Sequence, residues 1–191
     1  MNLYQQKYLK YKNKYELLKK QIGGDCPPLA ARRIGKDLQK LYNSPRWGIS
    51  AVLDELNVCK VHGTIAGPRG TPYEGYLWRV VMNFPSEFPF KAPTVNFVDR
   101  IFHPNIHYDS GSVCISILKT EGPDHWNPSL TAGTVLQSIQ SMLSDPNPNS
   151  PLNGYLKLYN IYKFTYFLYE CLSISSFKCV LYFLNPFTFA T

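Results

Sequence analysis

Alternating apolar and polar residues fill the middle of the chain and indicate a run of short β-strands. Four segments share this period-two pattern: Ile49–Leu53, Val58–Ala66, Tyr76–Phe84 and Thr94–Phe97. Turn residues separate them, including Gly67, Pro68, Gly70, Pro72 and Pro85. Consecutive short strands joined by tight connections predict a four-stranded antiparallel meander.

Helical spacing of apolar residues predicts a helix on each side of these strands. The first runs from Leu29 to Tyr42 and stops at Ser44-Pro45. Its apolar face consists of Ile34, Leu38 and Leu41. The apolar face of the second consists of Val135, Leu136, Ile139, Met142 and Leu143. This order predicts an α+β fold, a meander with an N-terminal helix and C-terminal helices.

A basic helical arm, residues 1–24, precedes this core. Its apolar seam is Tyr4, Tyr8, Tyr11, Tyr15, Leu18 and Ile22, and Gly23-Gly24 ends it. The arm is either a solvated basic helix or a docking or self-association segment, and the sequence leaves both open. It is similar to the lysine- and tyrosine-rich leaders of some giant-virus proteins.

Residues 156–191 differ in composition from the core, because they are aromatic and apolar with few charges. They fit a divergent pair of terminal helices, a membrane tail, or a segment with little selected structure. The stretch from Phe164 to Leu184 is long enough to span a bilayer. It contains Glu170 and Lys178, each costing about 2–3 kcal/mol at the bilayer centre. A tail anchor is therefore the less favoured interpretation.

The net charge of +7 is unevenly distributed over the 191 residues. The first 40 residues carry ten Lys or Arg and three acids, and the remainder carries ten of each sign. The basic excess thus belongs to the arm and the first helix. No basic and aromatic platform recurs along the core, so nucleic-acid binding is not favoured. An acidic protein partner for the first helix fits the distribution equally well.

The five cysteines do not form a recognisable framework. They are Cys26, Cys59, Cys114, Cys171 and Cys179. Their odd number, irregular spacing and lack of a Cys-x-x-Cys pair argue against disulfides and against a zinc site. The lysine-rich N-terminus has no apolar signal core. We therefore expect a reducing compartment, the cytoplasm or nucleus.

The stretch from His103 to Leu118 carries the candidate chemistry. Pro104 prevents a helix and favours an extended conformation for His103. After a turn, Val113, Ile115 and Ile117 alternate with Ser112, Cys114 and Ser116. The apolar set should face the core, which places Cys114 on the polar face. A cysteine is often a small buried hydrophobe, but this phase favours an accessible, reactive thiol.

These residues resemble the active-site stretch of ubiquitin-conjugating enzymes, which carry a His-Pro-Asn tripeptide and then a nucleophilic cysteine. The tripeptide matches His103, Pro104 and Asn105, and the nucleophile matches Cys114. The resemblance covers about residues 28–155 and implies the ubiquitin-conjugating (UBC) fold. It implies an enzyme that accepts ubiquitin from the activating enzyme as a thioester and passes it to a lysine amine, usually with a ligase. The alternatives are a non-catalytic ubiquitin-binding scaffold, which would lack the cysteine, or an enzyme for another ubiquitin-like modifier.

The same resemblance assigns roles to further residues. Asn105 would stabilise the oxyanion or hold the loop, and Ser150 would border the path of the acceptor lysine, where many members carry an acid. Contacts with the activating enzyme would come from Arg32, Arg33, Lys36 and Lys40. Contacts with a ligase would come from Phe90 and Pro128. The implied partners are ubiquitin, the activating enzyme, a ligase and substrate proteins.

No cofactor is expected, because ATP is used upstream by the activating enzyme. His103 and His107 have the i,i+4 spacing of a metal pair, but Pro104 removes the helix that would align them. No metal site is therefore expected. A dyad of Cys114 with His103, His107 or His125 is not favoured, because the resembled family works without one.

Overall fold

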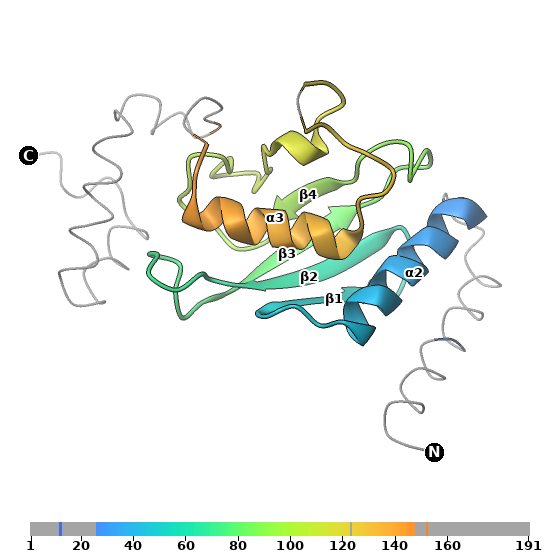
Figure 1. Ribbon diagram of the computed structural model, residues 1–191, viewed down its shortest axis with the longest axis horizontal. Helices are drawn as coiled ribbons and strands as arrows, with labels where there is room; N and C mark the ends of the chain where they lie inside the picture. Colours follow the sequence, from blue (N-terminus) through green and yellow to red (C-terminus); the bar gives the residue numbers. More distant parts are fainter. Residues whose placement is uncertain (1–11, 13–25, 123, 148–151, 153–191) are drawn as a thin grey trace, which may run out of the picture.

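The computed structural model describes residues 12, 26–122, 124–147 and 152, and its sheet is the predicted meander (Figure 1). The strands are β1 (Ile49–Leu53), β2 (Lys60–Ala66), β3 (Leu77–Asn83) and β4 (Thr94–Phe97). They pair antiparallel in the order β1-β2-β3-β4. The predicted α+β class is thus confirmed. β1 and β4 have the predicted bounds, whereas β2 and β3 begin later than predicted.

Two helices pack with this sheet, α2 (Pro28–Asn43) and α3 (Ala132–Ser144). In Figure 1, α3 crosses one face of the sheet and α2 lies beside β1. Pro28 occupies the first turn of α2, where the missing N–H costs nothing. Thr131 caps α3, since its hydroxyl accepts a hydrogen bond from the Thr134 N–H at 3.2 Å.

The core lies between the sheet and α3. The inward strand positions Val61, Ile65, Val80, Met82, Val95 and Phe97 are buried, as are Val135, Leu136 and Ile139 on α3. Gly63 on β2 sets how closely the helix approaches. A Cβ there would lie 2.9 Å from both the Leu136 and Val80 side chains. A side chain at this position would force the Leu136 and Val80 side chains to shift.

A disulfide joins Cys26 and Cys59, so the expectation of no disulfide was wrong. Cys26 lies just before α2 and Cys59 just before β2, 33 residues apart in sequence. Folding returns the chain past the start of α2, and the two Cα atoms come within 5.5 Å. That distance suits a disulfide. Counting cysteines missed the pair because this proximity is a property of the tertiary structure.

Both ends of the chain lie largely outside the described residues. Of the arm 1–24 the structure describes only Lys12, and of the 156–191 segment it describes nothing. Within the described ranges, no helix combines the length and the hydropathy that a membrane span requires. The candidate anchor at residues 164–184 is not among them.

The disulfide generates a test of stability. Replacing Cys26 by Ser should lower the free energy of unfolding in non-reducing buffer by roughly 2–4 kcal/mol, because the unfolded chain regains the entropy of an open 33-residue loop. Urea denaturation with and without reductant measures this, and reductant should abolish the difference between variant and parent. Peptide mapping of the unreduced protein that finds no linkage of Cys26 to Cys59 would contradict the pairing.

Candidate functional site

Cys114 lies at the end of a short bridged segment and not in a continuous strand. Ser112 and Val113 form isolated bridges with Asn96 and Ile106, and a single 3-10 turn, η1 (Ser116–Leu118), follows. The predicted alternation therefore ends near Cys114. The neighbouring apolar residues Val113, Ile115 and Ile117 pack against the core, but only half-buried. Cys114 is itself half-buried and forms no disulfide.

His103 is completely buried and connects the loop that precedes Cys114, residues 103–113, to α3. Its Nε2 lies 3.1 Å from the Met142 carbonyl oxygen, and its Nδ1 accepts the Asn105 N–H at 3.0 Å. Because a carbonyl only accepts, these partners assign the proton to Nε2. Burial lowers the pKa of His103 to about 4, so the ring is neutral at physiological pH.

Asn105 lies beneath the predicted nucleophile and is also completely buried. Its backbone carbonyl accepts the Cys114 N–H at 2.9 Å. Its side-chain amide forms a reciprocal pair with the Asn147 backbone, donating to the carbonyl and accepting from the N–H, both at 2.8 Å. This pairing shows that Asn105 holds the loop against the chain that follows α3. Asn147 itself has no sequence signal that marks it as a partner.

A second contact attaches the same loop to the chain beyond α3. The Leu152 N–H donates to the Pro104 carbonyl at 2.8 Å. Ser150, predicted to border the acceptor lysine, lies outside the described residues.

The three histidines near Cys114 in sequence are engaged elsewhere. Both ring nitrogens of His103 are occupied, so His103 cannot accept a proton from Cys114. His107 accepts the Ser110 N–H at 3.3 Å, and His125 donates to the Gly122 carbonyl at 2.8 Å. No group of three metal-ligating side chains occurs among the residues the structure describes.

The four basic residues predicted on the first helix divide into two groups. Arg32, Lys36 and Lys40 are exposed at i,i+4 spacing and form one stripe on α2. Arg33 does not belong to this stripe. Its guanidinium bonds with the buried Asp37 and with the backbone carbonyls of Pro128 and Leu130. Asp37 was not identified from the sequence, although its spacing of four from Arg33 was a usable signal.

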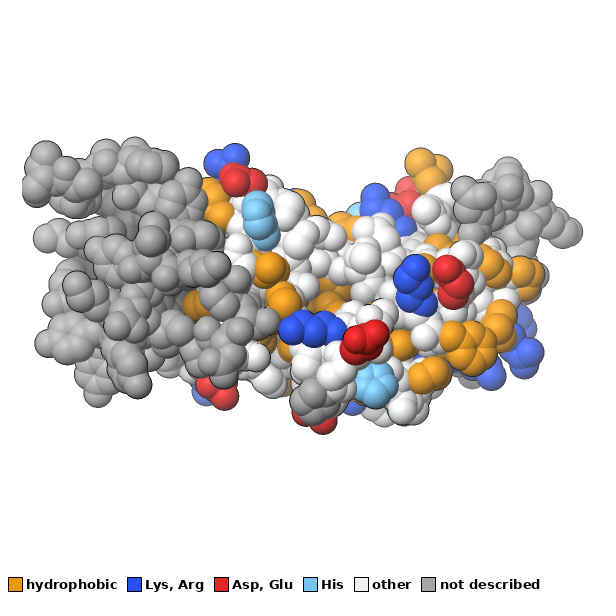
Figure 2. All heavy atoms as spheres, turned by 90° about the horizontal axis from the view of Figure 1, so that it is seen from above, with side chains coloured by type: hydrophobic (Ala, Val, Ile, Leu, Met, Phe, Trp, Pro, Cys, Tyr) orange, Lys and Arg blue, Asp and Glu red, His pale blue; other side chains and the backbone are white. Residues whose placement is uncertain are grey.

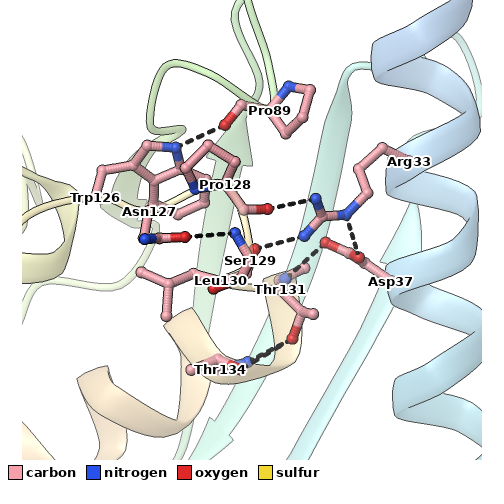
Figure 3. Close-up of polar contacts among 11 residues, drawn as sticks. Arg33, Asp37, Pro89, Trp126, Asn127, Pro128, Ser129, Leu130, Thr131 and Thr134 are labelled. Carbon is pink, nitrogen blue, oxygen red and sulfur yellow. Dashed lines mark hydrogen bonds and ion pairs between the residues drawn. The ribbon is translucent and has the colours of Figure 1, made fainter.

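The two predicted ligase-contacting loops lie next to each other. Phe90 is 73% exposed and Pro128 is also exposed, whereas Phe88 and Trp126 are buried. The Trp126 indole N–H donates to the Pro89 carbonyl at 2.8 Å, which joins the loops (Figure 3). The proline-rich setting therefore predicted the exposure of Phe90 correctly.

Comparison with known proteins identifies the relatives of this chain. A family model described as ubiquitin-conjugating enzyme matches residues 33–166. Ubiquitin-conjugating enzyme E2 N of Macaca fascicularis is 46% identical over 121 residues, covering 63% of this chain and 76% of that protein. Ubiquitin-conjugating enzyme E2 1 of Caenorhabditis elegans is 40% identical over 123 residues, covering 64% of this chain and 62% of that protein.

Solved structures agree with these matches. The structure of human ubiquitin-conjugating enzyme E2 G1 superposes with a TM-score of 0.59 at 35% identity, covering 63% of this chain and 98% of that one. A Toxoplasma gondii ubiquitin-conjugating enzyme E2 domain superposes with a TM-score of 0.63 at 36% identity, covering 73% of this chain and 91% of that one.

The buried His103 generates a prediction about acid stability. Its pKa is about 4 in the folded protein and about 6.5 in the unfolded chain, so unfolding takes up a proton below pH 6.5. The contribution of the neutral His103 ring to the free energy of unfolding is fully present above pH 6.5. It should fall by up to about 3 kcal/mol as the pH drops from 6.5 through 4. Urea denaturation from pH 7 to pH 4 should show a shallower pH slope for His103→Gln than for the parent. An NMR titration midpoint of His103 near 6.5 would refute the assignment.

Proposed function

Because this chain belongs to the ubiquitin-conjugating enzyme family, we propose that Cys114 is the nucleophile that carries ubiquitin as a thioester. The observation that carries the proposal is the backbone hydrogen bond from the Cys114 N–H to the Asn105 carbonyl. It keeps the thiol beside a loop that His103 and Asn105 attach to α3 and to the chain after it. A nucleophile on so rigid a support needs little reorganisation to react.

The proposed reaction has two acyl-transfer steps. The Cys114 thiolate attacks the thioester carbonyl of ubiquitin's C-terminal glycine on the activating enzyme, whose thiol leaves. A deprotonated lysine amine then attacks the new thioester, an isopeptide bond forms, the nitrogen loses its second proton, and the Cys114 thiolate departs. A thioester is already activated toward amines, so the second step requires an amine without its proton and stabilisation of the oxyanion. A hydrogen-bond donor aimed at that oxyanion contributes about 2.7–4 kcal/mol in comparable sites.

Asn105 is the proposed donor, alongside its role in holding the loop. Its amide is held in one orientation by the Asn147 backbone, which engages its carbonyl oxygen and one of its N–H groups. Ser150 is proposed to border the entering lysine, with a hydroxyl where many family members carry an acid.

The proposed partner surfaces follow the same assignment. The exposed stripe of Arg32, Lys36 and Lys40 would meet the activating enzyme, while Phe90 and Pro128 would meet a ligase. Nucleic acid is not a proposed partner. On the face in Figure 2, the Lys and Arg side chains are scattered and most lie beside Asp or Glu, unlike a phosphate-binding track.

No cofactor of its own is proposed, since ATP is consumed upstream. We propose the cytoplasm or nucleus as the enzyme's location, although the Cys26–Cys59 disulfide removes the lack of disulfides as support for a reducing compartment. The lysine- and tyrosine-rich arm favours a giant DNA virus as its source, in which case it would act in the host cytoplasm.

Charging assays test Cys114. With activating enzyme, ATP and ubiquitin, the parent should form an adduct that dithiothreitol cleaves. Cys114→Ser should form an oxygen ester that resists thiol, and Cys114→Ala should form no adduct. The same assay with a panel of ubiquitin-like modifiers tests the choice of modifier. Undiminished charging of Cys114→Ala would reject the nucleophile assignment.

Single-turnover discharge tests Asn105. Asn105→Ala should be charged nearly normally, but its thioester should react with free lysine about 10²–10³-fold more slowly, because the oxyanion loses its donor. Its thermal stability should also fall, because the Asn147 N–H and carbonyl lose their partner. Reduced stability with an unchanged discharge rate would leave Asn105 only its role in the loop.

A further inference from the structure

The Arg33 guanidinium connects α2 with the segment before α3, as Figure 3 shows, and also contacts Phe88. Its Nε donates to the Asp37 carboxylate at 2.8 Å, one turn further along α2. Its two terminal nitrogens donate to the carbonyls of Pro128 and Leu130, the latter at 2.8 Å. Its Cζ lies 5.7 Å from the centre of the Phe88 ring. One side chain therefore contacts both loops that carry the exposed Phe90 and Pro128.

Asp37 holds the guanidinium in this orientation. The carboxylate is only 4% exposed, and its second oxygen accepts the Ala132 N–H at the start of α3, at 3.1 Å. It thus satisfies one of the unpaired donors of that helix as well as Arg33. Asp37 therefore fixes the orientation of the Arg33 side chain on α2. It also joins the beginning of α3 to α2.

The two loops also contact each other beneath the exposed residues. Phe88 packs against Trp126 with ring centres 5.9 Å apart, and the Trp126 indole N–H donates to the Pro89 carbonyl. Arg33 lies against the Phe88 ring and bonds with the carbonyls after Trp126. The loops that carry Phe90 and Pro128 are therefore joined by the buried Phe88 and Trp126 and by the half-buried Arg33.

We propose that Arg33, oriented by Asp37, is a positioning residue that sets the relative placement of Phe90 and Pro128 for docking of a ligase. The proposal rests on the proposed function of those two residues as the ligase-contacting surface. It assigns to Arg33 a role different from that of Arg32, its exposed neighbour in the basic stripe. The role requires the planar fork of a guanidinium, because a lysine ammonium cannot bond the carboxylate and both carbonyls in this geometry.

A matched pair of charge-conserving variants tests the proposal, Arg33→Lys and Arg32→Lys. The probe is the purified RING domain that best stimulates discharge of the charged parent enzyme to free lysine. For Arg33→Lys, the RING concentration giving half-maximal stimulation should rise about tenfold, as expected for lost charge-assisted hydrogen bonds. For the same variant, discharge of the charged enzyme to free lysine without a RING domain should stay within about twofold. Arg32→Lys should leave the RING concentration that gives half-maximal stimulation unchanged.

A spectroscopic measurement separates positioning from a general loss of stability. In ¹H–¹⁵N spectra of the full chain, Arg33→Lys should shift the Trp126 indole resonance, and Arg32→Lys should not. Phe90→Ala tests the premise independently, because it should weaken RING stimulation without moving Trp126.

Each outcome decides the question. If Phe90→Ala weakens stimulation while Arg33→Lys behaves as the parent, the positioning role is wrong and the ligase surface stands. If Arg33→Lys slows unstimulated discharge and stimulated discharge alike, Arg33 is a general structural residue and the proposal is overturned. If Phe90→Ala has no effect, or no RING domain stimulates the parent, the proposed ligase surface is wrong and the inference falls with it.

Discussion

A neutral imidazole buried between a loop and a helix is the interaction on which the candidate site depends. His103 accepts from the Asn105 backbone on one side and donates to the Met142 carbonyl of α3 on the other. Only the neutral ring can perform both roles, and complete burial keeps it neutral. An unpaired Asn105 N–H or an imidazolium at this depth would destabilise the loop that supports Cys114.

α3 links this site to the opposite side of the domain. Near its C-terminal end, the helix and the chain that follows contact the loop before Cys114 through Met142 and Asn147. At its N-terminal end, Ala132 bonds with Asp37, which also orients Arg33 beneath the two exposed loops. Close packing over Gly63 holds the helix against the sheet between these ends. The placement of one helix therefore governs both the proposed nucleophile and the proposed ligase surface.

Much of the fold was predictable because the signals are local. Period-two alternation gave the bounds of β1 and β4, and helical spacing located α2 and α3 to within a few residues. β2 was predicted to begin too early, because Val58 and Cys59 lie in the turn before it, where the Lys60 N–H donates to the Asn57 carbonyl. β3 was predicted one residue too long at each end, although Tyr76 and Phe84 still bond with the neighbouring strand's flanks, at Gly67 and Cys59. Past Cys114, the η1 turn overrode an alternation that looked continuous in sequence.

In the candidate site, too, local features were predictable from the sequence and long-range contacts were not. The sequence by itself predicted the candidate chemistry: a His-Pro-Asn tripeptide, a cysteine in the short segment after it, and proline-rich loops that expose Phe90. These follow from residue type and spacing. The predicted difference in burial between the two faces of that segment was not found, because all residues from Ser112 to Leu118 are half-buried. Only the tertiary structure decided that Asn105 pairs with Asn147, that Cys26 pairs with Cys59, and that Arg33 turns away from its basic neighbours to bond beneath the loops. Each of these pairings joins chain segments at least 30 residues apart, and a local pattern contains no information about which distant backbone groups will need a partner.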